Sequence, residues 1–192
     1  MKRREIEKQL KKALDKDRFN HTLGVMYTAA ALAMAHGADM EQALYAGLLH
    51  DCAKCIPNEE KIALCRKYQI PVSAAEERSP FLLHAKLGAY YARNTYEIQD
   101  EEILHAIKVH TTGEPGMNTL DKIIYIADYI EPNRDQAPNL ETIRKLAFQN
   151  LDETMEQILG DTLSYLKEKG GEIDPLTAET YAYFHNKKTF PE

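Results

Sequence analysis

The chain has 192 residues, is 44% hydrophobic and carries a formal net charge of −6; this length can bury one sizeable core, which predicts a single domain over residues 1–192. The acidic balance argues against a nucleic-acid partner, because binding to a phosphate backbone depends on clustered Lys and Arg side chains. The charged segment 1–16 is unlike a signal peptide and no apolar run approaches the roughly 20 residues of a membrane span, so we expect a cytoplasmic protein with no membrane contact.

Apolar residues recur every three or four positions along the first half of the chain, which predicts amphipathic helices. Gly37 can end the second helix and Asp39 can cap the third. Pro71 closes the fourth. The expected segments are an apolar stripe over 6–14, a second stripe over 25–33, and helices from 40 to about 53, from a cap at Asn58 to about 68, and from about 82 to 95.

The second half continues this pattern. The run 123–126 could pass for a buried strand, but no partner strand is visible in the sequence, so a helix is favoured. The expected elements are a helix over 100–110, a break over 111–116, a helix capped by Asn118 or Thr119 that ends near Ile130, a loop over 132–138, and helices to the end apart from 170–175.

These elements predict an all-α fold. We find no internal repeat and no linker long enough to divide the chain. The prediction is one helical bundle with its core over about 18–134, a metal centre between its helices, and C-terminal helices over about 139–188.

Four histidines and two aspartates offer nitrogen and oxygen ligands suited to divalent transition metals. Three of the histidines lie three or four residues from a glycine on the same predicted helix, and small residues let helix backbones approach closely. Each aspartate would destabilise the fold if it were an unpaired anion. One lies near a helix C-terminus, where the helix dipole disfavours a negative charge, and the other lies in the most apolar helix, where burial disfavours it. A bound dication would remove both penalties. The candidate ligands are His21, His50, Asp51, His84, His110 and Asp128.

A simpler interpretation remains open for these residues. A lone His on an apolar helix face is more often a hydrogen-bonded core residue than a ligand, and the aspartates can pair with Arg18, Lys54 or Arg134. We interpret the other histidines as structural. His105 faces nearly opposite to His110 on the same predicted helix, so only one of them can reach a common site.

Several residues near the candidate ligands can contact an anionic substrate. Lys54 follows Asp51 by three residues and Arg18 precedes His21 by three, so either can act at the reacting group together with Asp51. The alternatives are a solvated or salt-bridged role for these two cations, and a plain turn for the segment 111–113. The candidate substrate contacts are Arg18, Lys54, Thr111, Thr112, Gly113 and Arg134.

Five segments carry a family resemblance. Their order of a His, an adjacent His and Asp, and a distant Asp resembles the HD-domain metal-dependent phosphohydrolases. They are similar, more narrowly, to the bacterial branch of symmetrical bis(5'-nucleosyl)-tetraphosphatases. The segments are RFNHTLGV at 18–25, AGLLHDCAK at 46–54, HAKLGA at 84–89, HTTG at 110–113 and IYIADYIEPNR at 124–134.

The resemblance implies an HD-domain helical bundle with two divalent transition metal ions, expected to be iron, with manganese, cobalt, nickel or zinc also suited. It implies hydrolysis of diadenosine tetraphosphate to two ADP by a metal-activated water, with Asp51 as the bridging ligand and ADP or GDP as product-like ligands. Another HD-type nucleotidase or phosphodiesterase and a non-catalytic nucleotide sensor are the rival functions. The aromatic residues Tyr181, Tyr183, Phe184 and Phe190 could cover the partner in a homodimer or the protein's own core.

Overall fold

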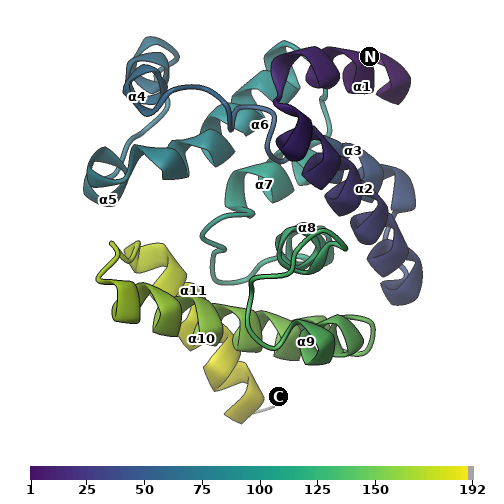
Figure 1. The fold of residues 1–192 in the computed structure, drawn as a ribbon, viewed down its shortest axis with the longest axis vertical. Coiled ribbons are helices and arrows are strands. Elements are labelled where there is room, and N and C mark those ends of the chain that lie inside the picture. The colour runs from purple at the N-terminus through teal and green to yellow at the C-terminus, as the bar shows by residue number, and fades with distance from the viewer. Residues whose placement is uncertain (190–192) are drawn as a thin grey trace.

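The computed structural model describes residues 1–189, and Phe190 lies outside this range. Within it the chain forms eleven α-helices, one short 3-10 helix and no strand, which confirms the all-α prediction (Figure 1). No helix of these 189 residues has the length and apolar character needed to cross a membrane. The elements are α1 (Arg3–Ala13), α2 (Lys16–His36), α3 (Met40–Leu49), α4 (Asn58–Lys67), α5 (Ala74–Arg78), η1 (Pro80–Leu83), α6 (His84–Asn94), α7 (Glu101–Val109), α8 (Thr119–Ile130), α9 (Leu140–Ala147), α10 (Leu151–Lys169) and α11 (Pro175–Thr189).

Several helix ends are formed by the residues that the sequence predicts. Gly37 follows α2 with a φ of 67°, a left-handed conformation that favours glycine. Asp39 caps α3 by accepting hydrogen bonds from two backbone N–H groups. Asn118 caps α8 in a reciprocal arrangement with Asp121.

Other boundaries differ from the prediction. α3 ends at Leu49 rather than near Ala53, because the chain after it makes successive tight turns, in which the N–H of Cys52 donates to Leu49 O. Asn58 does not cap α4; its side chain accepts a hydrogen bond from Lys61 Nζ at 3.0 Å, and Pro57 precedes the helix instead.

The short helix α5 and the break between α9 and α10 were not predicted. Ser73 and Glu76 form a capping box at the start of α5. Asn150 caps α10 by accepting from the N–H of Glu153, so the chain turns between two helices where the sequence predicts continuous helix.

Helix α8 lies near the middle of the molecule, with α2, α3 and α7 on one side and α9 and α10 on the other (Figure 1). Gly47 allows α3 to approach α2, because a Cβ built there would lie 2.8 Å from Met26 Cα. Helix α11 packs on α10 and buries Phe184, while Tyr181 is partly buried against the same core. These two aromatic residues therefore cover the protein's own core.

Candidate metal centre

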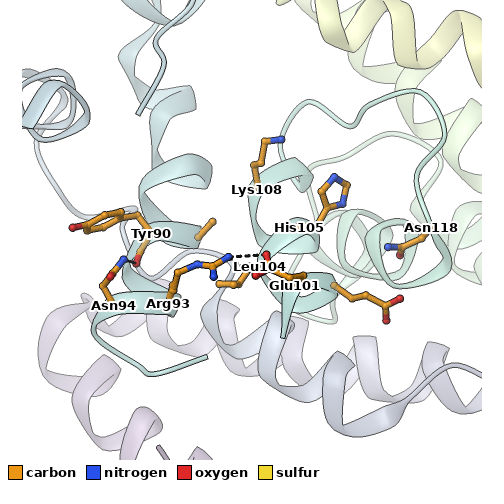
Figure 2. A pocket seen from close by; sticks show the side chains of 10 residues that line it. Tyr90, Arg93, Asn94, Glu101, Leu104, His105, Lys108 and Asn118 are labelled. Carbon is orange, nitrogen blue, oxygen red and sulfur yellow. Dashed lines mark hydrogen bonds and ion pairs between the residues drawn. The ribbon is translucent and has the colours of Figure 1, made fainter. Parts of the chain in front are cut away.

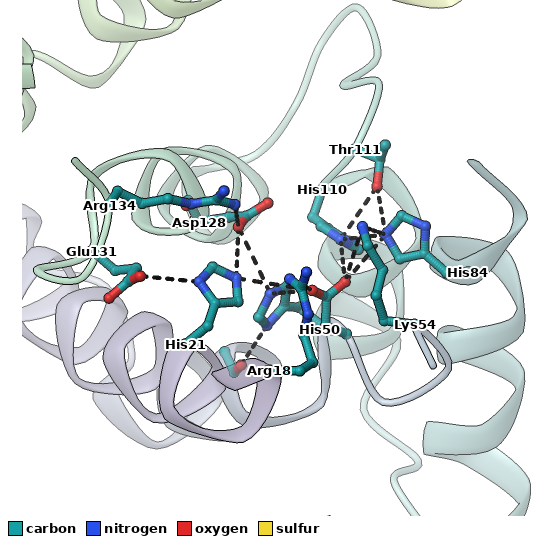
Figure 3. A network of polar contacts seen from close by, with 12 residues as sticks. Arg18, His21, His50, Lys54, His84, His110, Thr111, Asp128, Glu131 and Arg134 are labelled. Carbon is teal, nitrogen blue, oxygen red and sulfur yellow. Dashed lines mark hydrogen bonds and ion pairs between the residues drawn. The ribbon is translucent and has the colours of Figure 1, made fainter. Parts of the chain in front are cut away.

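The six candidate ligands come from five separate helices or helix ends and lie together in one cluster (Figure 3). Their ligand atoms form three groups of three, and within each group all atoms lie within 4.8 Å of one another. The residues come from α2 (His21), the turn after α3 (His50 and Asp51), the start of α6 (His84), the end of α7 (His110) and α8 (Asp128).

One half of this cluster contains His21, His50 and Asp128. The Nε2 atom of His21 lies 3.0 Å from Asp128 Oδ1, and the Nε2 atom of His50 lies 3.9 Å from the same oxygen. Asp51 presents its Oδ2 atom to this half, at 3.9 Å from His21 Nε2 and 3.5 Å from His50 Nε2.

The other half contains His84 and His110, whose Nε2 atoms lie 3.2 Å apart. Asp51 turns its second oxygen, Oδ1, to this pair, at 3.2 Å from His84 Nε2 and 3.6 Å from His110 Nε2. The Asp51 carboxylate thus lies between the two halves, with one oxygen facing each.

Hydrogen bonds at Nδ1 fix the orientation of each imidazole ring. His50 donates from Nδ1 to Gly47 O at 2.7 Å, and His110 donates from Nδ1 to Ile107 O at 2.7 Å. His84 donates in the same way to the carbonyl of Phe81. Because a carbonyl oxygen only accepts, the proton of each neutral ring is at Nδ1 and the lone pair at Nε2 points into the cluster.

His21 is oriented by Glu131, a residue that the sequence analysis did not single out. Glu131 is 1% exposed, and its Oε1 accepts from His21 Nδ1 at 3.1 Å. Its Oε2 accepts from the backbone N–H and the side-chain amide of Asn133, at 2.8 and 2.9 Å. A carboxylate behind a ligating histidine is a common support of metal sites. Glu131 lies within the segment 124–134, so the family resemblance was the one available signal.

The buried ligand atoms include several with unused hydrogen-bonding capacity. Among the described residues, His21 Nε2, His50 Nε2 and Asp51 Oδ1 are buried side-chain atoms without a hydrogen bond. Carboxylate and imidazole atoms lie near them, but outside hydrogen-bond geometry. Buried polar atoms left unsatisfied in this way cost about 1–3 kcal/mol each. A divalent cation fits this set, because its bonds to these nitrogens and oxygens would satisfy them.

The charges of the cluster also suit a cation. Burial raises the pKa of Asp51, but the neighbouring His50, His110 and His84 outweigh it and hold that pKa well below its usual range. Burial lowers the pKa of His84 to about 4, so this imidazole is neutral at pH 7. Metal ligation needs both forms, the ionised carboxylate and the neutral imidazole.

The three basic side chains that the simpler interpretation pairs with the aspartates do lie beside them. Arg18 Nη1 is 2.6 Å from Asp51 Oδ2, and Lys54 Nζ is 3.6 Å from Asp51 Oδ1. Arg134 Nη2 is 2.8 Å from Asp128 Oδ1. The ion pairs of the simpler interpretation are therefore formed, yet they leave the imidazole Nε2 atoms of His21 and His50 unsatisfied.

A cavity of about 380 Å³ opens beside the cluster, and Lys54, Asp128 and Arg134 are among its lining residues. Thr111 also lines it, with Oγ1 at 3.1 Å from His84 Nε2 and 3.2 Å from His110 Nε2. Thr112 and Gly113 do not line this cavity. Thr112 donates to Gly113 O, and Gly113 has a φ of 67° and packs against Thr180.

The remaining histidines have other partners. His105 contacts Asp121 at 2.9 Å and Glu114 at 2.8 Å, away from the cluster. It lines a separate cavity of about 630 Å³, to which none of the six candidate ligands contributes (Figure 2). His36 contacts the carbonyl of Ala147, and His185 contacts Glu156.

Comparison with known proteins places this geometry in context. A family model described as HD domain matches residues 18–133. A protein of Bacillus subtilis (strain 168) named symmetrical bis(5'-nucleosyl)-tetraphosphatase is 41% identical over 181 residues, which cover 94% of this chain and 96% of that one. A protein of the same name from Halalkalibacterium halodurans is 42% identical over 175 residues, covering 90% and 91%. The crystal structure of a predicted HD superfamily hydrolase involved in NAD metabolism, from Clostridium acetobutylicum, matches with a TM-score of 0.94 at 37% identity and covers 97% and 98% of the two chains.

Proposed function

The chain belongs to the HD domain family, and on that premise we propose that it is a metal-dependent phosphohydrolase that cleaves diadenosine tetraphosphate into two ADP. Two relatives named symmetrical bis(5'-nucleosyl)-tetraphosphatase match at least 90% of the chain at more than 40% identity. The single observation that carries the proposal is the position of Asp51, whose two carboxylate oxygens face two separate groups of imidazole nitrogens.

We assign the six candidate ligands to two cations. His21, His50 and Asp128 would hold the first, His84 and His110 the second, and Asp51 would bridge the two. When bound, such a pair supplies Lewis acidity to phosphoryl oxygens and activates a water for attack on phosphorus. Iron is the proposed metal, although the same donors suit manganese, cobalt, nickel or zinc.

The basic side chains near the metal centre have distinct roles in the proposal. Lys54 Nζ lies 3.0 Å from His84 Nε2 and borders the cavity, so it can neutralise charge on the phosphoryl group that is attacked. Arg18 holds the Asp51 carboxylate in place through its 2.6 Å contact. Arg134 lies at the cavity wall and can bind an outer phosphate of the chain, next to a nucleoside, through two N–H groups.

The reaction consumes one water. Its oxygen adds to one of the two central phosphorus atoms, and the bridging oxygen between these atoms leaves with the neighbouring phosphate and takes up a proton, so that two ADP form. Thr111 Oγ1 lies 3.1 Å from His84 Nε2 and 3.2 Å from His110 Nε2, and its hydroxyl can donate to a phosphate oxygen bound there. ADP and GDP are the proposed product-like ligands.

Product analysis tests this function against its rivals. The protein is incubated with diadenosine tetraphosphate and manganese or iron(II), and the nucleotides are separated by anion exchange. We expect ADP as the only product. AMP together with ATP would indicate an asymmetric hydrolase, and tight nucleotide binding without turnover would indicate a sensor; either result would overturn the proposal.

Two further points belong to the proposal. Residues 1–192 act as one domain, because α10 and α9 pack directly on α8 of the metal core. A homodimer remains a prediction, for which Tyr183 is the remaining exposed aromatic residue of the C-terminal group among those described.

A further inference from the structure

A third cavity, of about 510 Å³, shares the lining residue Thr111 with the cavity beside the metal centre. We call it the α11 cavity, because its lining residues come from the start of α11 and from α5, η1 and α6. The ribbons of α5 and α11 lie near each other in Figure 1. Its apolar lining includes Leu82, Val109 and Leu176. Its polar lining includes Lys86, Lys108 and Glu179.

Thr111 connects the α11 cavity to the metal centre. This residue lines both cavities. Its hydroxyl oxygen lies 3.1 Å from His84 Nε2 and 3.2 Å from His110 Nε2. A linear molecule that passes Thr111 at the centre can therefore extend into both cavities.

The walls of the α11 cavity are fixed by their own contacts. Lys86 Nζ donates to Glu76 Oε2 at 2.7 Å and to Pro71 O at 2.9 Å, which ties α6 to α5 and the segment before it. Arg78 at the end of α5 donates to Glu172 from Nη2 at 2.6 Å and from Nε at 3.1 Å. This pair joins the α5 side of the cavity to the loop that leads into α11.

The chemistry of the α11 cavity suits a nucleoside. Apolar side chains can cover the faces of a base, while the hydroxyl of Thr112 and the carboxylate of Glu179 can hydrogen-bond its edge or the ribose. Lys108 is exposed and has no ion pair among residues 1–189, so its ammonium group is free to approach a phosphate. The volume falls within the roughly 300–1,000 Å³ of typical small-molecule sites.

We propose that the α11 cavity binds one nucleoside of the substrate while the cavity beside Arg134 binds the other. The inference rests on the proposed function and adds a subsite to it. A dinucleoside tetraphosphate carries a nucleoside at each end, and cleavage at its central bond requires the phosphate chain to extend to both sides of the metal centre. Two cavities that meet at Thr111 provide this arrangement, which places the central phosphates over His84 and His110.

Filling the α11 cavity tests the inference. Leu176→Trp places a bulky side chain in it, and Glu179→Trp does so from an exposed position at which a folding defect is not expected. Ala178→Trp is the matched control, since Ala178 is exposed on the same helix and does not line the cavity. Each variant is assayed for KM with diadenosine tetraphosphate, and for the inhibition constant of adenosine 5'-tetraphosphate, which has the same four phosphates but one nucleoside.

We expect both cavity-filling variants to raise KM for diadenosine tetraphosphate at least tenfold, and to leave the inhibition constant of adenosine 5'-tetraphosphate within about twofold. The Ala178 variant should match the wild type in both. An unchanged KM in both cavity-filling variants, or equal rises in KM and the inhibition constant, would overturn the inference while symmetric cleavage by the wild type stood. A wild type that does not cleave the dinucleotide would overturn the proposed function and the inference together.

Discussion

Gly24 leaves open the space that the Glu131 carboxylate fills. A Cβ built on Gly24 would lie 2.2 Å from Glu131 Oε2 and 3.0 Å from its carboxyl carbon. The other oxygen of Glu131 accepts the hydrogen bond that orients His21. A glycine one turn after His21 in α2 therefore permits the contact that holds this histidine toward the metal centre.

Gly24→Ala is expected to displace Glu131 and weaken metal binding. Without its carboxylate partner the His21 ring is free to rotate, and loss of such a support commonly lowers metal affinity or activity by about 10- to 100-fold. The measurement is the metal dissociation constant, from titration of the chelator-treated protein, with kcat recorded on the same samples.

Gly160→Ala is the matched control, because this glycine also lies within a helix and an added Cβ would make only an ordinary contact, 3.4 Å from Tyr181. It should bind metal like the wild type and be about 0.5–1 kcal/mol more stable. Equal metal affinity in both variants would show that the position of Glu131 has no effect on the centre.

Replacing each of the two aspartates should remove a different number of metal ions. Asp51 faces both halves of the cluster, whereas the histidines paired with Asp128, His21 and His50, both belong to the first half. Asp51→Ala should lose both ions, and Asp128→Ala should retain about one per chain, with turnover lost in each. Elemental analysis gives the metal content, and Asp152→Ala, which affects an ion pair with Lys122, serves as the control. Equal metal loss in the Asp51 and Asp128 variants would contradict the bridging position.

Arg134→Lys tests phosphate binding at the cavity wall. Lysine keeps the charge but cannot form two parallel N–H contacts with one phosphate. We expect KM for diadenosine tetraphosphate to rise about tenfold with kcat nearly unchanged, as for an interaction of equal strength in the ground and transition states. Arg66→Lys, at an exposed position on α4, should leave both constants as they are. A fall in kcat with unchanged KM would assign Arg134 to the chemical step instead.

The stability of the metal-free protein should depend on pH through His84. Burial lowers the pKa of His84 in the folded protein to about 4, from an ordinary value of 6.5. Between these values the unfolded chain binds a proton that the folded chain does not, so the free energy of unfolding rises with pH, by up to about 3 kcal/mol.

Urea unfolding of chelator-treated protein at pH 5 and pH 7 measures the part of this change that falls between these two pH values, about 2 kcal/mol. His84→Asn should reduce it, whereas His185→Asn, at an exposed site on α11, should preserve it. A His84 variant that keeps the full pH dependence would show that this group is not its source.

How much of the site can be predicted from the sequence depends on how local its determinants are. His21, His50 and His84 each lie three or four residues from a glycine, and in the structure each of these glycines allows a close approach: Gly24 to Glu131, Gly47 to Met26 and Gly88 to the carbonyl of His50. This local pattern is visible in the sequence.

The role of Glu131 depends on more distant contacts. It follows the end of α8, and its carboxylate contacts His21, 110 residues earlier in the chain, while its other oxygen accepts from the backbone N–H of Asn133. No local pattern encodes this. The break at Asn150 was not predicted either. A single capping residue does not interrupt the spacing of the apolar residues, which continues from one helix into the next.

Reconstitution with metal tests the central claim most directly, namely that these imidazoles and carboxylates hold a pair of catalytic cations. Chelator-treated protein is titrated anaerobically with iron(II) or manganese, and bound metal and ADP release from diadenosine tetraphosphate are measured on the same samples. The account predicts no turnover without metal and a plateau at about two ions per chain. Full ADP release from protein that holds less than about 0.1 ion per chain would contradict it.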